Sequence, residues 1–201
     1  MFDAKLRPLI DSPLDQLARF VTDHGWTANQ VTVAGFVIGL LAIPAIVIEA
    51  YLVGLVLILL NRLADGLDGA VARRTGKTDR GGFLDITLDF IFYSSIPFAF
   101  ALADPFENAL AAAFLIFSFI GTGCSFLAYA IMAEKRGLST DIRGQKSLYY
   151  LGGLTEGTET IVLFVACCLF PVWFPVMAVI FGVICWVTTA TRIHAGWHSF
   201  D

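Results

Sequence analysis

Long apolar runs separated by short polar segments dominate the chain. Each run is about twenty residues long, the length that an α-helix needs to cross the hydrocarbon core of a bilayer. The pattern predicts an all-α integral membrane protein with about six transmembrane helices. The expected spans are Val31–Ile48, with a kink at Pro44, and then Tyr51–Arg73, Phe83–Leu102, Asn108–Ala133, Leu148–Phe170 and Val172–His194.

The segment before the first run is amphipathic. Ser12 and Pro13 are typical of a helix start, and Gly25 of a helix end. The apolar residues of this segment share one helical face: Leu14, Leu17, Ala18 and Val21. We expect an interfacial helix over about residues 12–24 that lies on the membrane surface. An ordered tail without a membrane role is the alternative.

The composition supports the membrane class. Hydrophobic residues make up 57% of the 201 positions and charged residues only 15%, whereas soluble proteins carry about 25% charged residues. We therefore expect a single membrane domain over residues 1–201. Its expected partner is the lipid bilayer, and no nucleic-acid partner is expected. Lys and Arg gather in alternate loops, so the positive-inside rule places these loops and both termini in the cytoplasm.

Four aspartates lie where the second run ends and the third begins. Asp65 and Asp68 are three residues apart, and Asp85 and Asp89 are four apart, so each pair shares a helical face. The loop between the two runs is short, which makes the helices antiparallel neighbours. We therefore expect the four carboxylates to converge at the cytoplasmic mouth of this helix pair.

Carboxylates packed so closely need a counter-charge. Arg62 and Arg73 can supply part of it, and a divalent ion with oxygen ligands can supply more. Gly69, Ala72 and Gly81 leave space for a flat ligand to lie against the backbone, although small residues also allow close helix packing. A divalent metal beside a basic loop suggests a diphosphate substrate.

These residues together resemble the signature of the CDP-alcohol phosphotransferase family. The matching positions are Asp65-x2-Asp68-Gly69-x2-Ala72-Arg73-x7-Gly81-x3-Asp85-x3-Asp89. The segment from Thr27 to Thr32 resembles the family's lead-in to its first span. The layout as a whole is similar to a small branch of the family in the bacterial inner membrane.

The resemblance implies transfer of a phosphatidyl or other phosphoalcohol group from a CDP-linked donor, in most bacterial members CDP-diacylglycerol, to the hydroxyl of an acceptor alcohol. CMP is released, and the reaction belongs to phospholipid biosynthesis. One or two Mg²⁺ or Mn²⁺ ions would be held by Asp65, Asp68, Asp85 and Asp89, with Asp89 also the catalytic base. The CDP site would comprise Asp65, Asp68, Gly69, Ala72, Arg73, Gly81, Asp85, Thr27, Asn29 and Thr32. Homodimers are common in the family.

The acceptor alcohol is left open. The basic loop residues are candidates for binding an acceptor phosphate, or else are loop charge attracted to anionic lipid: Lys77, Arg80, Arg143 and Lys146. Glu156 and Glu159 share a face within the fifth run. They could bind the ammonium group of an amino alcohol, pair with Arg62 or Arg192, or hold a further metal.

Two other classes of protein compete with the transferase. A small ion or solute transporter could use the intramembrane aspartates to line an ion path. Transporters often contain repeated halves, and this sequence shows no convincing internal repeat. A structural membrane subunit would leave the aspartates unexplained. Loss of CMP release on replacing Asp89 with alanine would separate the transferase from both alternatives.

Overall fold

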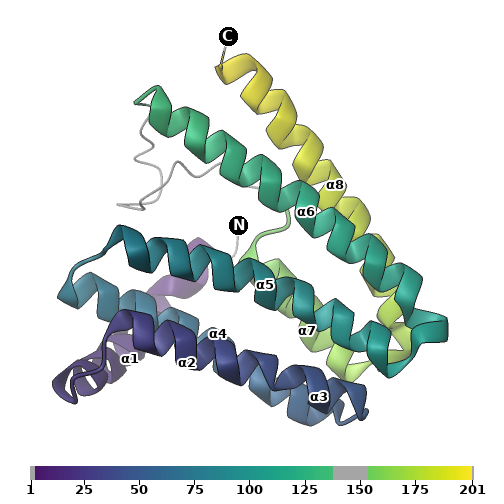
Figure 1. Ribbon diagram of the computed structural model, residues 1–201, viewed down its shortest axis with the longest axis horizontal. Coiled ribbons are helices and arrows are strands. Elements are labelled where there is room, and N and C mark those ends of the chain that lie inside the picture. The colour runs from purple at the N-terminus through teal and green to yellow at the C-terminus, as the bar shows by residue number, and fades with distance from the viewer. Residues whose placement is uncertain (1–2, 138–153, 201) are drawn as a thin grey trace.

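The computed structural model describes residues 3–137 and 154–200, and within these ranges it contains helices and no strands. This confirms the predicted all-α class (Figure 1). The helices in chain order are α1 (Asp3–Asp23), α2 (Ala28–Leu40), α3 (Ala42–Val47), α4 (Tyr51–Thr75), α5 (Asp79–Ala103), α6 (Pro105–Lys135), α7 (Gly157–Leu169), the short 3-10 helix η2 (Pro171–Trp173) and α8 (Phe174–Ser199).

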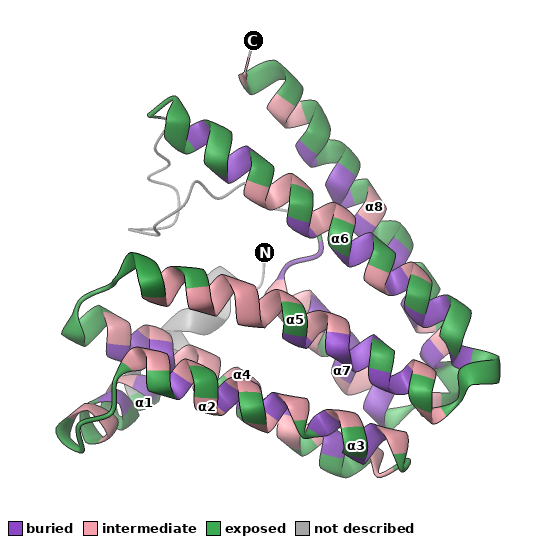
Figure 2. Ribbon diagram, viewed as in Figure 1, coloured by how far each residue is buried: buried purple, intermediate pink, exposed green. Residues whose placement is uncertain are grey.

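Among the described residues, 4 helical stretches are long and apolar enough to cross a membrane: Ala28–Val47, Asp79–Ala103, Pro105–Lys135 and Pro171–Ser199. The helices α4 and α7 take the places of the other two expected spans. α4 has the length of a span, but Arg62, Asp65 and Asp68 interrupt its apolar run. α7 is shorter, with 13 residues. Exposed residues, many of them large and apolar, face outward along the helices (Figure 2), as a lipid-facing surface requires.

Helix α1 differs from the predicted helix over residues 12–24 in where it begins. It starts at Asp3, so Ser12 lies inside the helix and is not its N-cap. The stretch before Ser12 includes Ala, Lys, Leu and Arg, which favour a helix, but also Pro8, which disfavours one, so helix propensity alone does not explain the earlier start. Its end agrees with the prediction, because Gly25 has a φ of +81° that favours glycine.

Part of the apolar face of α1 is buried against the rest of the protein, and part of it is exposed. Leu14 and Ala18 are buried against Ala70 and Val71 of α4. Leu17 is 43% exposed. α1 is thus fastened to the helix that carries the first two aspartates, while part of its apolar face stays open. Its location in the membrane interface remains a prediction.

Helices α2 and α3 together form the first span, and α2 packs closely on α4. The helix breaks at Leu41, three residues before Pro44, which agrees with the predicted kink because Pro44 has no N–H to donate to the carbonyl of residue 40. A Cβ atom on Gly35 would lie 2.5 Å from the Cβ of Ala64, so only glycine allows this approach. The side-chain amide of Asn61 donates to the Gly35 carbonyl oxygen at 2.9 Å and ties the two helices together.

Helix α5 begins earlier than predicted, at Asp79 instead of Phe83. Thr78 is its N-cap, and the Thr78 hydroxyl accepts the Gly81 N–H at 3.1 Å. α4 continues to Thr75, so residues 76–78 alone connect the two helices. This tight connection makes α4 and α5 antiparallel neighbours, as the short loop predicted.

The fifth span begins later than predicted within the described residues. α7 starts at Gly157, with Glu156 as N-cap, and residues 154–156 are not helical. The Glu159 carboxylate accepts the Glu156 N–H at 3.1 Å, which favours a helix start at this point. The part of the predicted span over residues 148–153 lies outside the described residues.

Candidate active site

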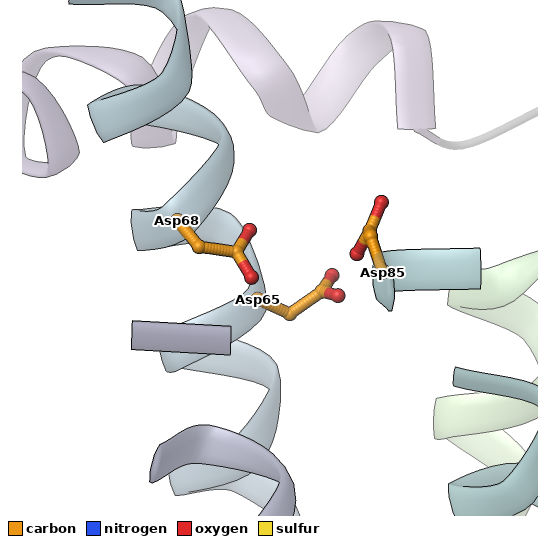
Figure 3. Close-up of side chains that lie close together, drawn as sticks. All are labelled: Asp65, Asp68 and Asp85. Carbon is orange, nitrogen blue, oxygen red and sulfur yellow. The ribbon is translucent and has the colours of Figure 1, made fainter. Parts of the chain in front are cut away.

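Three of the four predicted aspartates form a compact cluster between α4 and α5. Asp65 and Asp68 project from successive turns of α4, and Asp85 projects toward them from α5 (Figure 3). Each residue offers one carboxylate oxygen, and these oxygens lie within 4.8 Å of one another. The helix spacing explains the pair on α4, and the antiparallel packing brings the third residue to it.

The chemistry of this cluster fits a hard divalent ion. Oδ2 of Asp68 is buried and has no hydrogen-bond partner among the residues that the structure describes. A buried carboxylate oxygen without a partner carries a large desolvation cost. An ion shared by Asp65, Asp68 and Asp85 would give it a partner and neutralise three converging charges.

Asp89 lies in the same cleft, but its described partner is a cation. Its Oδ1 accepts from Nη2 of Arg62 at 2.8 Å. Nη1 of Arg62 also lies 3.7 Å from Oδ2 of Asp65. Arg62 therefore stands between Asp89 and the cluster of three aspartates. The predicted counter-ion role of Arg62 is visible here, whereas the role of Asp89 as a metal ligand remains a prediction.

The guanidinium group of Arg62 is held by several neighbours. Its Nε and Nη2 donate to Oδ1 of Asn61 at 2.8 and 2.6 Å, and its Nη1 donates to the Tyr93 hydroxyl at 3.0 Å. The same group lies over the ring of Phe92, 4.7 Å from the ring centroid. Tyr93 was not among the predicted site residues, although it follows Asp89 by four residues and so shares its helical face.

A narrow cleft joins these groups. It is bounded by α2, α4 and α5 and is lined by Thr32, Gly35, Phe36, Asn61, Arg62, Asp65, Asp68, Asp85, Leu88 and Asp89. Thr32, predicted to contact CDP, is thus brought to the aspartates. The predicted residue Asn29 lines a wider groove elsewhere on α2, together with Arg80 and apolar side chains that include Trp26 and Phe83. Thr27 is the N-cap of α2.

The small residues of the signature differ in their surroundings. A Cβ atom on Gly81 would lie 3.0 Å from Oδ1 of Asn29 and 3.1 Å from Oγ1 of Thr78, so a larger residue here would require these side chains to shift by a few tenths of an ångström. A Cβ atom on Gly69 would meet only the terminal Nη1 of Arg73, at 3.6 Å. Ala72 is half-buried and Arg73 is exposed. Packing therefore does not explain Gly69.

The candidate acceptor residues lie at several places. Arg143 and Lys146 fall outside the described residues. Glu156 is buried at the start of α7, and Glu159 lies in the first turn. A Cβ atom on Gly157 would lie 3.2 Å from the Tyr93 hydroxyl, so the start of α7 borders the residues that hold Arg62. Within the described residues, the carboxylates that pair with Arg62 belong to Asp65 and Asp89, not to the two glutamates.

Comparisons of the sequence place the chain among known proteins. Residues 26–193 match the CDP-alcohol phosphatidyltransferase family. The chain is 55% identical over 197 residues to the inner membrane protein YnjF of Escherichia coli (strain K12), covering 98% of this chain and 96% of that protein. It is 38% identical over 100 residues to the archaetidylinositol phosphate synthase of Pyrococcus horikoshii, covering 49% of this chain and 53% of that protein.

Solved structures share the fold. Phosphatidylinositol phosphate synthase of Mycobacterium tuberculosis in complex with manganese and citrate is 23% identical with a TM-score of 0.73, over 92% of this chain and 88% of that chain. The same enzyme with CDP-DAG bound gives a TM-score of 0.68 at 21% identity, over 92% and 93%. The family match overturns the transporter alternative. The chain belongs to the CDP-alcohol phosphatidyltransferase family and is a membrane-embedded transferase.

Proposed function

We propose that this protein transfers a phosphatidyl group from CDP-diacylglycerol to the hydroxyl of an alcohol and releases CMP. One observation carries the proposal: Asp65, Asp68 and Asp85 offer oxygens within 4.8 Å of one another, and Asp89 lines the same cleft. A metal-binding cluster with a separate carboxylate beside it suits phosphoryl transfer. The M. tuberculosis relative in fold, whose structures contain CDP-DAG or manganese, supports this choice of donor and ion.

The residues divide the reaction between them. The acceptor oxygen forms a bond to the phosphorus distal to cytidine, and the bond from that phosphorus to the bridging oxygen breaks. CMP leaves with the electron pair of that bond, and Asp89 takes the proton of the hydroxyl. Asp65, Asp68 and Asp85 would hold Mg²⁺ or Mn²⁺, which when bound would neutralise negative charge on the diphosphate and on the leaving phosphate. Thr32 and Gly69 border the donor, with Arg73 near its phosphates.

We propose that the catalytic end of the protein faces the cytoplasm in a bacterial inner membrane. The connection between α4 and α5 carries Lys77 and Arg80, and α6 ends at Lys135 and Arg136. Basic residues at the ends of spans favour the cytoplasmic side. The similarity to an inner membrane protein of E. coli agrees with this location.

The acceptor, in this proposal, approaches Asp89 from the side of α7. Gly157 borders the Tyr93 hydroxyl, and the Tyr93 hydroxyl in turn accepts from Arg62, the partner of Asp89. Glu156 and Glu159 at the start of α7 would favour an acceptor that bears an ammonium group. Arg143 and Lys146 would instead favour a phosphorylated alcohol.

A panel of acceptors tests both the reaction and this choice. Purified protein with CDP-diacylglycerol and Mn²⁺ or Mg²⁺ should release CMP when one class of alcohol is added. Stimulation by amino alcohols alone supports the glutamates, and stimulation by phosphorylated alcohols alone excludes them as the selecting residues. An absence of CMP release with every acceptor would contradict the proposed reaction.

Replacing Gly69 with alanine should separate ligand space from helix packing. The new methyl group has room in the protein, and alanine is about 0.5–1 kcal/mol better than glycine within a helix, so stability should hold or rise. If CDP lies against this backbone, the KM for the donor should rise by roughly tenfold, since forced overpacking costs about 1–3 kcal/mol. Melting temperature and CMP-release kinetics measure the two effects. An unchanged KM would place the donor elsewhere.

A further inference from the structure

A wide groove lies between the beginnings of α2 and α5, apart from the aspartate cleft. Its volume is about 860 Å³, and ligand sites in proteins typically enclose about 300–1,000 Å³. It is lined by His24, Gly25, Trp26, Asn29, Gln30, Val33, Ala34, Arg80, Phe83 and Leu84. We propose that this groove binds one anionic phospholipid of the bilayer, which the protein holds without converting it.

The groove and the aspartate cleft lie on different faces of the same two helices. On α5, Arg80, Phe83 and Leu84 share one face through their spacing of three and four residues. Asp85 is five residues beyond Arg80, which places it about 140° around the helix axis from Arg80. On α2, the residues that line the groove and those that line the cleft have no member in common. A lipid in the groove therefore leaves the cleft open to the substrates.

The walls of the groove are apolar and face the surroundings. Trp26 is 50% exposed, Val33 is 45% exposed and Phe83 is 71% exposed. The groove lies where α2 and α5 begin, and each of these helices begins a stretch that is long and apolar enough to cross a membrane. Side chains at this level meet the boundary between head groups and acyl chains, where Trp is enriched in membrane proteins. An acyl chain can therefore lie along Val33 and Phe83, with its head group at the ends of the helices.

Arg80 gives the groove a positive charge. Its side chain is exposed and makes no ion pair or hydrogen bond with the other residues that the structure describes. The residues that line the groove include no Asp or Glu, and Asp79, its neighbour in sequence, is not among them. A guanidinium group can bind two phosphate oxygens through parallel hydrogen bonds. The phosphodiester of a lipid would thus meet a cation in the groove without a competing carboxylate.

Gln30 adds a neutral donor to the same groove. Its Oε1 accepts from the Thr27 N–H at 2.9 Å as part of the cap of α2. The amide nitrogen of Gln30 is therefore the atom that can donate to a ligand. A zwitterionic head group would find no acidic partner for its ammonium group among the lining residues. The charge of the groove therefore favours an anionic lipid over a zwitterionic one.

Quenching of Trp26 by brominated lipids tests the inference. The full chain would be placed in phosphatidylcholine vesicles that contain a rising fraction of brominated phosphatidylglycerol or, separately, of brominated phosphatidylcholine. The contribution of Trp26 is the difference in fluorescence between the unchanged protein and Trp26→Phe. Half of the quenching should be reached at an about fivefold lower fraction of the anionic lipid, the preference that one cation provides at a membrane surface.

Three variants relate this preference to Arg80. Arg80→Gln removes the charge and should abolish the preference for the anionic lipid, whereas Arg80→Lys keeps the charge and should retain most of it. Arg74→Gln is the matched control, because Arg74 is an exposed arginine in the last turn of α4 and does not line the groove. This control should keep the full preference. Arg80 and Arg74 are both exposed, so we expect these variants to fold, and the melting temperature in detergent checks this.

Several results would overturn the inference. Equal quenching by the two lipids would mean that the groove takes bilayer lipid without selection. A preference that survived in Arg80→Gln, or that was lost in Arg74→Gln, would come from the general charge of the protein. A Trp26 that neither lipid quenched would mean that protein covers the groove, for example a second copy of the chain. The measurement contains no CDP-diacylglycerol and no metal, so its result is independent of the proposed transfer reaction.

Discussion

Replacing Asp89 with asparagine is expected to lower the kcat of CMP release by about 10²–10⁴-fold while the protein still folds and inserts. The amide has the shape of the carboxylate but cannot accept the proton of the acceptor hydroxyl. Its oxygen can still accept from Arg62, whose other bonds to Asn61 and Tyr93 remain. The loss should therefore appear in kcat, with little change in the KM of the CDP-linked donor.

Asp79→Asn provides the matched control for this prediction. Asp79 lies on the same helix, in its exposed first turn and outside the cleft. The control should lose at most a helix N-terminal charge effect of about 0.3–1 kcal/mol in stability and keep its turnover. CMP release with saturating acceptor measures the turnover of both variants, and the melting temperature in detergent measures their stability. Turnover of Asp89→Asn within about threefold of the unchanged protein would remove Asp89 from its role as the base.

The aspartate cluster could be predicted because local geometry determines most of it. Asp65 and Asp68 share a face of one helix through their spacing, and the short connection fixes α5 beside α4. These relations depend on residues close in sequence. The prediction therefore reached the three carboxylates that lie within 4.8 Å of one another, and it placed Asp89 in the same cleft.

The choice of partner for Arg62 could not be made from the sequence. Asp89 is 27 residues away on another helix, and the expected spans contained several acids, including Glu156, Glu159, Asp65 and Asp89. Selecting among them requires the rotation of each helix and the position of α7, which depend on packing between residues distant in sequence. Tyr93 was overlooked for a related reason. Its hydroxyl accepts a hydrogen bond from Arg62, and that contact depends on how α4 and α5 pack.

The helix boundaries also depend partly on residues that are close in sequence and partly on polar contacts that the apolar pattern does not reveal. The start of α5 at Asp79 follows from a local signal, the Thr78 cap, that the apolar pattern alone does not contain. The start of α7 at Gly157 depends on the pair of glutamates acting on the backbone at a helix end, whereas the sequence pattern favoured an uninterrupted span. Polar residues at the end of a span therefore indicate a helix boundary as readily as a binding site.

Replacing Asp68 with asparagine is expected to reduce CMP release by about 10³-fold or more, because metal ligation and charge neutralisation fail together. Among the three clustered aspartates, Asp68 is the one whose substitution tests metal binding with the least effect on other contacts. Asp65 also lies 3.7 Å from Arg62, whereas Oδ2 of Asp68 has no hydrogen-bond partner among the described residues. The substitution therefore removes a metal ligand without breaking the Arg62 network.

The stability of the same variant separates a metal site from a structural cluster. Without metal, Asp68→Asn removes one of several repelling carboxylates at a position only 6% exposed, so the metal-free melting temperature should hold or rise. The unchanged protein should gain about 2.7 kcal/mol of stability from Mn²⁺ at one hundred times its dissociation constant, and the variant should gain almost none. Melting with and without Mn²⁺ measures both effects, with Asp79→Asn again as the control that keeps the full gain. If Asp68→Asn instead lowered the metal-free melting temperature and kept its response to Mn²⁺, the carboxylate would support the fold, and the ion would bind elsewhere.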